Sequence, residues 1–142
     1  MSKIRLGFVG VGGMGQAAHL RNYLTLPDCE VVALAEVRPR LGAAVAARYG
    51  VPKVYDGHRA LLAAESLDGI VAVQQFTAHA DLVPELLEKG VPLLTEKPLA
   101  DSVANGEIVA AAAAKAKAPL YLAYHKRSDP ATTYAKRQMD RV

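Results

Sequence analysis

The fold of this chain is indicated by residues 6–15, which read Leu6-Gly7-Phe8-Val9-Gly10-Val11-Gly12-Gly13-Met14-Gly15. The glycines at 10, 12 and 15 have the G-x-G-x-x-G spacing, between an apolar strand-like run and a helix-like segment. Gly10 lets the chain turn sharply out of the strand, Gly12 lets the backbone approach a pyrophosphate, and Gly15 lets the helix pack closely on the sheet. The free backbone N–H groups at the start of the following helix favour the binding of a phosphate group. The stretch predicts a dinucleotide-binding loop, with Gly13 and Met14 as further contacts.

The rest of the chain alternates short apolar runs with longer helix-like stretches. We expect strands at residues 4–9, 31–36, 53–55, 70–73, 92–95 and 120–124. We expect helices at residues 14–25, 39–48, 58–64, 80–89 and 102–117, and from Pro130 onward. Runs such as residues 70–73 are apolar on successive positions, which indicates a parallel sheet covered on both faces. The alternation therefore predicts an α/β fold: a doubly wound parallel sheet (Rossmann fold) in three layers.

Three helix boundaries have a local physical cause. Asp101 is placed to cap the long alanine-rich helix, whose last turn carries lysines, the favoured charge there. Gly50 and Gly90 each follow a helix and precede a strand, where a left-handed C-terminal cap favours glycine.

Composition excludes several classes of protein. With 51% hydrophobic residues, 26 of them alanine, the 142-residue chain is too apolar to be disordered. One cysteine, Cys29, builds neither a disulfide framework nor a thiolate zinc site, and it fits a reducing, cytoplasmic compartment. The charges that sum to +3 are interspersed, so we expect no nucleic-acid partner, and no apolar run is long enough for a membrane helix. The densest basic zone, residues 126–141, is better explained as a solvated helix face or an interface.

The histidines are not spaced to bind a metal ion, so we expect no metal site. His19 falls inside the first expected helix. We therefore expect it to pack or face solvent rather than to take part in catalysis.

Glu36 ends the second expected strand and lies 21 residues beyond Gly15. An acidic side chain at about this separation accepts hydrogen bonds from the adenosine ribose hydroxyls. A carboxylate repels a 2′-phosphate, so Glu36 favours NAD over NADP, whereas Arg38 and Arg40 offer guanidinium groups that can pair with that phosphate. We expect NAD as the cofactor, with NADP the less favoured; the alternative is a solvated strand end followed by two helix-start arginines.

A charged motif, Glu96-Lys97-Pro98, directly follows the expected fifth strand. Charged residues at this point lie on the edge of a parallel sheet where ligands bind. Lys97 is a candidate to supply a proton or a cationic hydrogen bond, with Glu96 to hold it in place. Pro98 would fix the turn, and the Lys97-Pro98 bond is open to the cis form. Taken alone, Glu-Lys-Pro is also a common surface turn.

Together the glycine loop, Glu36 and Glu96-Lys97-Pro98 resemble the Gfo/Idh/MocA oxidoreductases, the glucose–fructose oxidoreductase and inositol dehydrogenase family. The resemblance continues to residues 124–130, which look like the family's sixth strand, paired basic residues and a proline that opens the next helix. It implies hydride transfer between NAD(P) and a carbinol carbon of a sugar or polyol. By this resemblance Lys97 would be the catalytic residue, against the nicotinamide ribose and the substrate hydroxyl, and Arg127 would border the same cleft.

The loop after the fourth expected strand departs from the family pattern. The family commonly has Thr-Pro-Asn there, and this chain reads Gln74-Gln75-Phe76-Thr77. By the resemblance, Gln74 and Gln75 would lie against the nicotinamide side of the cofactor. His79 falls at the family's usual histidine, where a ligand role and a bond to a backbone carbonyl both remain open.

The resemblance also implies a second domain, because family members are two-domain enzymes of more than twice this length. We expect residues 1–125 to form the dinucleotide-binding domain. Residues 126–142 would begin the connection to a substrate domain absent from this chain. Such a half-enzyme is expected to be inactive by itself and to form a homo-oligomer through its exposed surface. The alternative is a non-catalytic Rossmann module for nucleotide binding, regulation or assembly.

Overall fold

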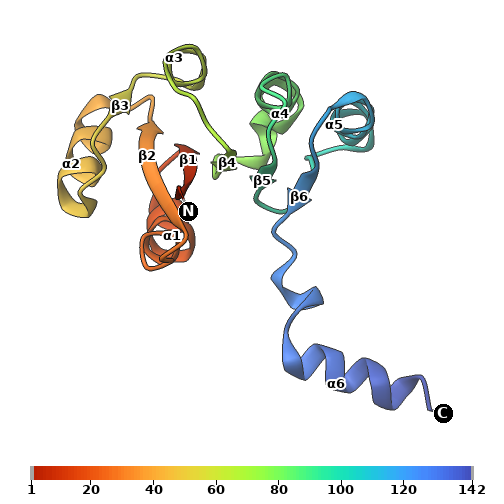
Figure 1. Ribbon diagram of the computed structural model, residues 1–142. Helices are drawn as coiled ribbons and strands as arrows, with labels where there is room; N and C mark the ends of the chain where they lie inside the picture. Colours follow the sequence, from red (N-terminus) through yellow and green to blue (C-terminus); the bar gives the residue numbers. More distant parts are fainter. Residues whose placement is uncertain (1, 142) are drawn as a thin grey trace.

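The computed structural model describes residues 2–141 and contains one parallel six-stranded sheet. The strand order is β3-β2-β1-β4-β5-β6 (Figure 1). The strands are β1 (Ile4–Val9), β2 (Cys29–Ala35), β3 (Val54–Tyr55), β4 (Gly69–Ala72), β5 (Leu93–Thr95) and β6 (Leu120–Leu122). β1 pairs with both β2 and β4. β2 and β3 are therefore added to one side of β1 and the last three strands to its other side, as in doubly wound folds. The predicted fold class is confirmed.

Helices cover both faces of this sheet (Figure 1). One face carries η1 (Gly15–Leu20), α1 (Arg21–Tyr23) and α2 (Pro39–Tyr49). The other carries α3 (His58–Ala64), α4 (His79–Leu87) and α5 (Val103–Lys115). Two short turns, η2 (Phe76–Ala78) and η3 (His125–Arg127), precede α4 and α6 (Pro130–Met139). The helices thus form the outer layers of the expected three-layer arrangement.

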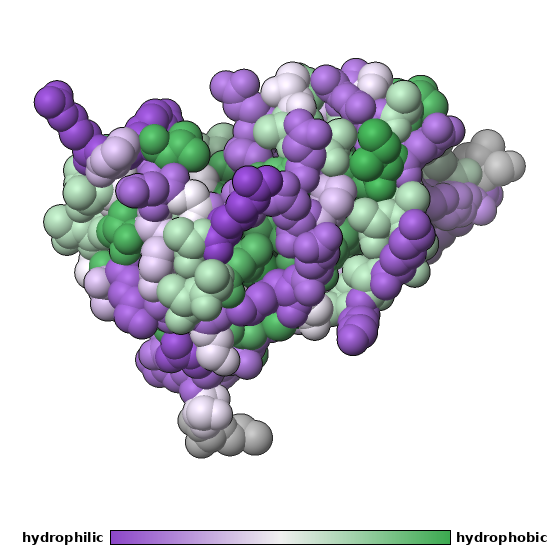
Figure 2. Space-filling model, turned by 90° about the horizontal axis from the view of Figure 1, so that it is seen from above, coloured by the Kyte–Doolittle hydropathy of each residue, from purple (hydrophilic) through white to green (hydrophobic). Residues whose placement is uncertain are grey.

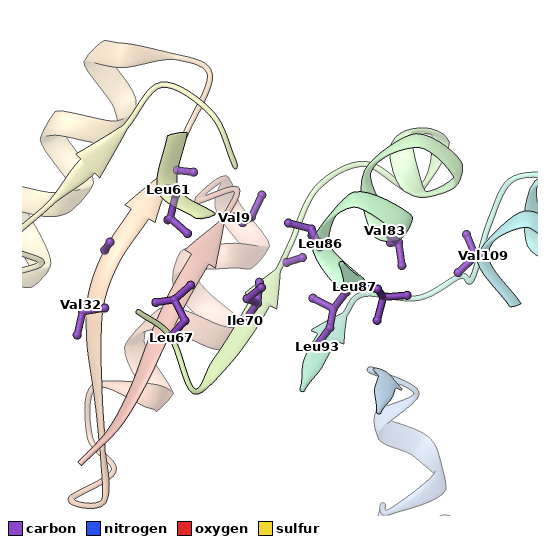
Figure 3. Packing of buried hydrophobic residues seen from close by; sticks show 13 residues of the cluster. Val9, Val32, Leu61, Leu67, Ile70, Val83, Leu86, Leu87, Leu93 and Val109 are labelled. Carbon is purple, nitrogen blue, oxygen red and sulfur yellow. The ribbon is translucent and has the colours of Figure 1, made fainter. Parts of the chain in front are cut away.

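Each face of the sheet has its own hydrophobic core. On the side of α3, α4 and α5, Leu61, Val83, Leu86 and Val109 pack over Ile70 and other strand residues (Figure 3). On the opposite side, Phe8 and Leu34 pack with Leu20 of η1 and Val45 of α2. Strand residues are therefore buried on both faces, as their continuous apolar pattern predicted. Seen from the α3–α5 side, the surface intersperses polar and apolar side chains (Figure 2).

Some helix boundaries follow the sequence signals and others do not. Gly50 and Gly90 adopt left-handed conformations with φ of 69° and 74°, so both predicted caps are confirmed. The predicted Asp101 cap is wrong. Ser102 caps α5, since its Oγ accepts a hydrogen bond from the Asn105 N–H at 3.2 Å, whereas Asp101 accepts one from the Asn105 side chain.

The first helix is less regular than expected. In place of one α-helix over residues 14–25, the chain forms the π-helical segment η1 and a short α1. Gly15 lies at the start of η1, and a Cβ on it would come within 2.7 Å of the Gly10 carbonyl oxygen. Such π-type widening of a helix is frequent next to functional sites.

The last segment of the described chain, α6, extends away from the sheet (Figure 1). None of its residues is buried, and Asp129 caps it by accepting hydrogen bonds from the N–H groups of Ala131 and Thr132. Among the described residues, no helix is long and apolar enough to span a bilayer. Within the same part of the chain, no three His, Cys, Asp or Glu side chains gather as a metal site.

Candidate functional site

A cleft of about 740 Å³ opens at the carboxyl ends of the central strands. It lies between the loops that follow β1 and β4, the two neighbouring strands at which the strand order changes from one side of the sheet to the other. Doubly wound sheets bind ligands at this position. The cleft brings together eleven of the residues that the sequence singled out: Gly10, Gly12, Gly13, Met14, Gly15, Glu36, Arg38, Gln74, Gln75, Glu96 and Lys97.

The glycines of the loop divide into two pairs. Gly10 has φ of 85°, and a Cβ on it would collide with the carbonyl oxygen of Val73. A Cβ on Gly15 would likewise collide with Gly10. Gly10 and Gly15 are thus required by the fold, as predicted. Gly12 and Gly13 are open with respect to residues 2–141: a Cβ on Gly12 meets only Arg38 Nη2, at 3.7 Å, and one on Gly13 meets nothing within 4 Å. Their bare backbone leaves room for a ligand.

Glu36 follows β2 directly and is almost fully buried beside the glycine loop, with 3% of its surface exposed. One carboxylate oxygen accepts the Val11 N–H at 3.1 Å, and the other accepts the Arg38 N–H at 3.1 Å. Arg38 also donates from its side chain to both oxygens, from Nε at 2.7 Å and from Nη2 at 3.0 Å. The Arg38 guanidinium holds the pKa of Glu36 below its ordinary value; backbone N–H groups act in the same direction and burial opposes them.

This ion pair gives Arg38 a position that the sequence did not specify. Its guanidinium lies over Gly12 and covers the carboxylate of Glu36, while its side chain stays 62% exposed. A ribose whose hydroxyls donate hydrogen bonds to the Glu36 carboxylate must therefore displace or rotate an exposed arginine. The side chain of Arg40 makes no hydrogen bond or ion pair within residues 2–141 and is exposed.

Glu96 and Lys97 of the Glu96-Lys97-Pro98 segment form the wall of the cleft beyond β5. The Lys97-Pro98 peptide bond is cis, the form that the sequence had left open. Lys97 is exposed, and its amine has no hydrogen-bond or ion-pair partner among the described residues. Glu96 Oε2 accepts the Lys97 backbone N–H at 3.2 Å, and Glu96 Oε1 lies 2.7 Å from His19 Nε2.

His79 lies behind the cleft rather than on its surface. It is fully buried, and its Nδ1 donates to the Leu99 carbonyl oxygen at 3.0 Å. Its Nε2 lies 3.5 Å from Thr95 Oγ1. Of the two roles considered from the sequence, the geometry favours the bond to a backbone carbonyl. Pro98 is likewise absent from the cleft lining.

The side chain of Gln74 in the cleft carries a buried acceptor without a hydrogen-bond donor among the described residues. Its Nε2 donates to Thr95 Oγ1 over a long 3.5 Å, and its Oε1 is buried without a partner among the described residues. A buried carbonyl oxygen of this kind is costly unless a donor reaches it. A bound ligand is one source of such a donor.

Like His79 and Pro98, Arg127 is a predicted site residue that lies outside the cleft lining. It belongs to η3, after the sheet has ended, and does not line the cleft. His58 and Leu82 do line the cleft and were not singled out from the sequence. The sequence also missed the pairing of His19 with Glu96, because no local pattern links positions 77 residues apart.

Comparison with known proteins agrees with this geometry. A family model described as "Oxidoreductase family, NAD-binding Rossmann fold" (Gfo/Idh/MocA) matches residues 4–124. Inositol 2-dehydrogenase of Rubrobacter xylanophilus is 34% identical over 130 residues, covering 90% of this chain and 37% of that protein. Inositol 2-dehydrogenase 1 of Saccharopolyspora erythraea is 34% identical over 140 residues, covering 96% of this chain and 41% of that protein.

Solved structures show the same fold. Myo-inositol 2-dehydrogenase from Lactobacillus plantarum matches with a TM-score of 0.89 at 20% identity, over 99% of this chain and 42% of that one. Scyllo-inositol dehydrogenase from Lactobacillus casei, solved with NAD(H) and scyllo-inositol, matches with a TM-score of 0.83 at 22% identity, over 99% and 42%. The chain therefore spans about two fifths of these proteins, at 37–42%. The glycine loop, the strand-end acid and the matched family model together show that this chain belongs to the Gfo/Idh/MocA oxidoreductase family, as its NAD-binding Rossmann domain.

Proposed function

We propose that this chain binds NAD in the cleft and forms the cofactor half of an enzyme that oxidises or reduces a sugar or polyol at a carbinol carbon. The observation that carries the proposal is the combination of open backbone at Gly12 and Gly13 with the buried acid Glu36 and the exposed amine of Lys97, all in one cleft. The first two features fit the phosphates and ribose of a dinucleotide, and the third fits proton transfer.

Each candidate residue has a role in this proposal. The backbone of Gly12, Gly13 and Met14 accommodates the pyrophosphate, while Gly10 and Gly15 shape the loop. The carboxylate of Glu36 accepts hydrogen bonds from the adenosine ribose once the Arg38 guanidinium has moved aside. Gln74 and Gln75 face the nicotinamide end, where the unpaired Gln74 Oε1 fits an amide donor.

Chemistry at the other end of the cleft depends on Lys97. When bound, NAD supplies the nicotinamide that accepts or returns a hydride. Lys97 would hold or move the proton of the substrate hydroxyl, and Glu96, Pro98 and His79 would fix the shape of its loop. Arg127 would border the cleft only after a rearrangement of η3, because it lies outside the cleft in this structure. Relatives named as inositol dehydrogenases support a polyol as the substrate class.

Domain organisation and partners complete the proposal. Residues 1–125 act as the dinucleotide-binding domain, and 126–142 begin the connection to a second, substrate-binding domain; the separation of α6 from the sheet supports this division (Figure 1). Exposed apolar side chains near that end, Tyr121, Tyr124, Tyr134 and Met139, support self-association into a homo-oligomer. The buried free thiol of Cys29 supports a cytoplasmic location.

Isothermal titration of the 142-residue chain with NADH tests the cofactor assignment. We expect saturable binding, with NADPH binding more weakly. Circular dichroism first establishes that the sample is folded. A folded chain that takes up no NADH at millimolar concentration would contradict the proposal.

A further inference from the structure

We propose that His19 is a positioning residue for Lys97, acting through Glu96. The inference rests on the proposed role of Lys97 at the reacting carbon. It assigns a task to a histidine of η1, the segment after the glycine loop, which covers the opposite face of the sheet from α4 and α5 (Figure 1).

The contact between His19 and Glu96 is short and largely shielded from water. His19 Nε2 and Glu96 Oε1 are 2.7 Å apart, and their side chains are only 12% and 14% exposed. Hydrogen bonds to a carboxylate are roughly twice as strong as neutral ones, and shielding from solvent strengthens them further. The His19–Glu96 contact therefore holds the Glu96 side chain more firmly than an ordinary surface ion pair would.

The second oxygen of the same carboxylate connects His19 to Lys97. Glu96 Oε2 accepts the backbone N–H of Lys97 at 3.2 Å. A carboxylate held at one oxygen by the helix thus holds, at the other, the backbone from which the lysine side chain projects. Removing His19 would free the Glu96 side chain to rotate away and release the Lys97 N–H.

The same loop is also held from the other face of the sheet. His79, at the start of α4, donates to the Leu99 carbonyl oxygen at 3.0 Å. Thr95 Oγ1 donates to the Ala72 carbonyl oxygen on the neighbouring strand at 3.2 Å. The backbone around Lys97 is thereby fixed by η1, α4 and β4, while its amine has no partner in the described part of the chain. A rigid frame around a free reactive group is the arrangement that a precise catalytic site needs.

A second histidine–glutamate pair in the chain provides a matched comparison. His58 Nε2 and Glu85 Oε2 are also 2.7 Å apart, and they link α3 to α4. Within residues 2–141 the remaining partner of Glu85 is the exposed side chain of Arg59, so this pair holds no loop backbone there. If His19 merely fastened a helix to the sheet, losing either pair would have the same kind of effect.

Backbone-amide NMR of the ¹⁵N-labelled chain separates these two roles without any cofactor. In His19→Ala we expect the Lys97 amide to shift and to exchange with solvent about tenfold faster, as loss of one charge-assisted hydrogen bond predicts. His19→Gln, which keeps a donor, should restore much of the wild-type resonance and exchange rate. His58→Ala should leave the Lys97 amide unchanged.

The outcomes are distinct. A Lys97 amide that is unchanged in His19→Ala, with a fall in stability like that of His58→Ala, would overturn the inference. If His19→Ala does not fold, His19→Asn replaces it, because asparagine keeps a polar side chain that is too short to reach Glu96. An unchanged Lys97 amide in His19→Asn would also contradict the positioning role of His19. Absence of NADH binding by the wild-type chain would instead overturn the proposed function, and the amide comparison would still decide the role of His19.

Discussion

His19 Nε2 lies 2.7 Å from Glu96 Oε1, although the two residues are 77 positions apart. The contact joins the helix that follows the glycine loop to the loop that carries Lys97. On the other side of the cleft, the Val11 N–H of the glycine loop donates to Glu36. The glycine loop and its helix are therefore tied to the ends of both β2 and β5, so three motifs that are distant in sequence form one connected site.

The two pairs of loop glycines should respond differently to alanine. Gly15→Ala should lower the free energy of unfolding by about 1–3 kcal/mol, the usual cost of overpacking, because its Cβ would press on the Gly10 carbonyl. Gly12→Ala should fold normally and weaken NADH binding at least about tenfold, since its Cβ enters the open part of the cleft. Urea denaturation and isothermal titration measure the two effects.

Gly106→Ala is the matched control, because Gly106 lies within α5 and has only Leu99 within 4 Å of the added Cβ. It should leave NADH binding unchanged and raise stability by about 0.5–1 kcal/mol. Equal loss of NADH affinity in Gly106→Ala and Gly12→Ala would show that the loop has no special role.

The Glu36–Arg38 pair should set the preference between NADH and NADPH. Glu36→Gln should weaken NADH binding about tenfold, because the acceptor loses its charge. The ratio of the NADPH dissociation constant to the NADH dissociation constant should therefore fall. Arg38→Ala should raise that ratio, because the guanidinium no longer offsets the negative charge of Glu36 that faces a 2′-phosphate. Arg40→Ala, which removes an exposed arginine without a partner in residues 2–141, should change neither constant. A ratio that is the same in all four proteins contradicts this explanation.

Stability should fall in acid partly through Glu85. Arg59, followed by His58, lowers the pKa of Glu85 from 4.5 to about 2. A carboxyl with a lowered folded-state pKa stabilises the fold at pH values above its unfolded pKa, and this contribution is lost as the pH falls toward 2. Urea midpoints measured between pH 7 and pH 3 should therefore fall less steeply in Glu85→Gln than in wild type. Parallel curves for the two proteins would exclude this contribution.

Removal of the buried His79 side chain should be costly. His79→Ala leaves a cavity and deprives the Leu99 carbonyl oxygen of its donor, so the free energy of unfolding should drop by about 2–4 kcal/mol. His125→Ala, at an exposed position in η3, should change it by less than about 0.5 kcal/mol. Equal unfolding free energies for the two variants, measured in urea, would mean that His79 is not a structural support of the loop.

Local sequence patterns predicted those parts of the fold whose cause is local. The Gly10 turn, the left-handed caps at Gly50 and Gly90 and the doubly buried strands depend on backbone freedom and on runs of apolar residues, and all were confirmed. The cap of the alanine-rich helix was predicted at Asp101 but lies at Ser102, because both residue types suit that position and the direction of the first helical N–H groups decides between them.

The sequence by itself determined that this is a parallel α/β chain with a dinucleotide-type loop, because glycine spacing and hydrophobic period act over a few residues. Only the tertiary structure decided which polar groups meet: Arg38 covers Glu36, His79 lies behind the cleft, and His19 holds Glu96. These contacts depend on how helices from both faces of the sheet approach the ends of its strands. Side chains that are far apart in the sequence come within hydrogen-bonding distance only after the hydrophobic cores have fixed that arrangement.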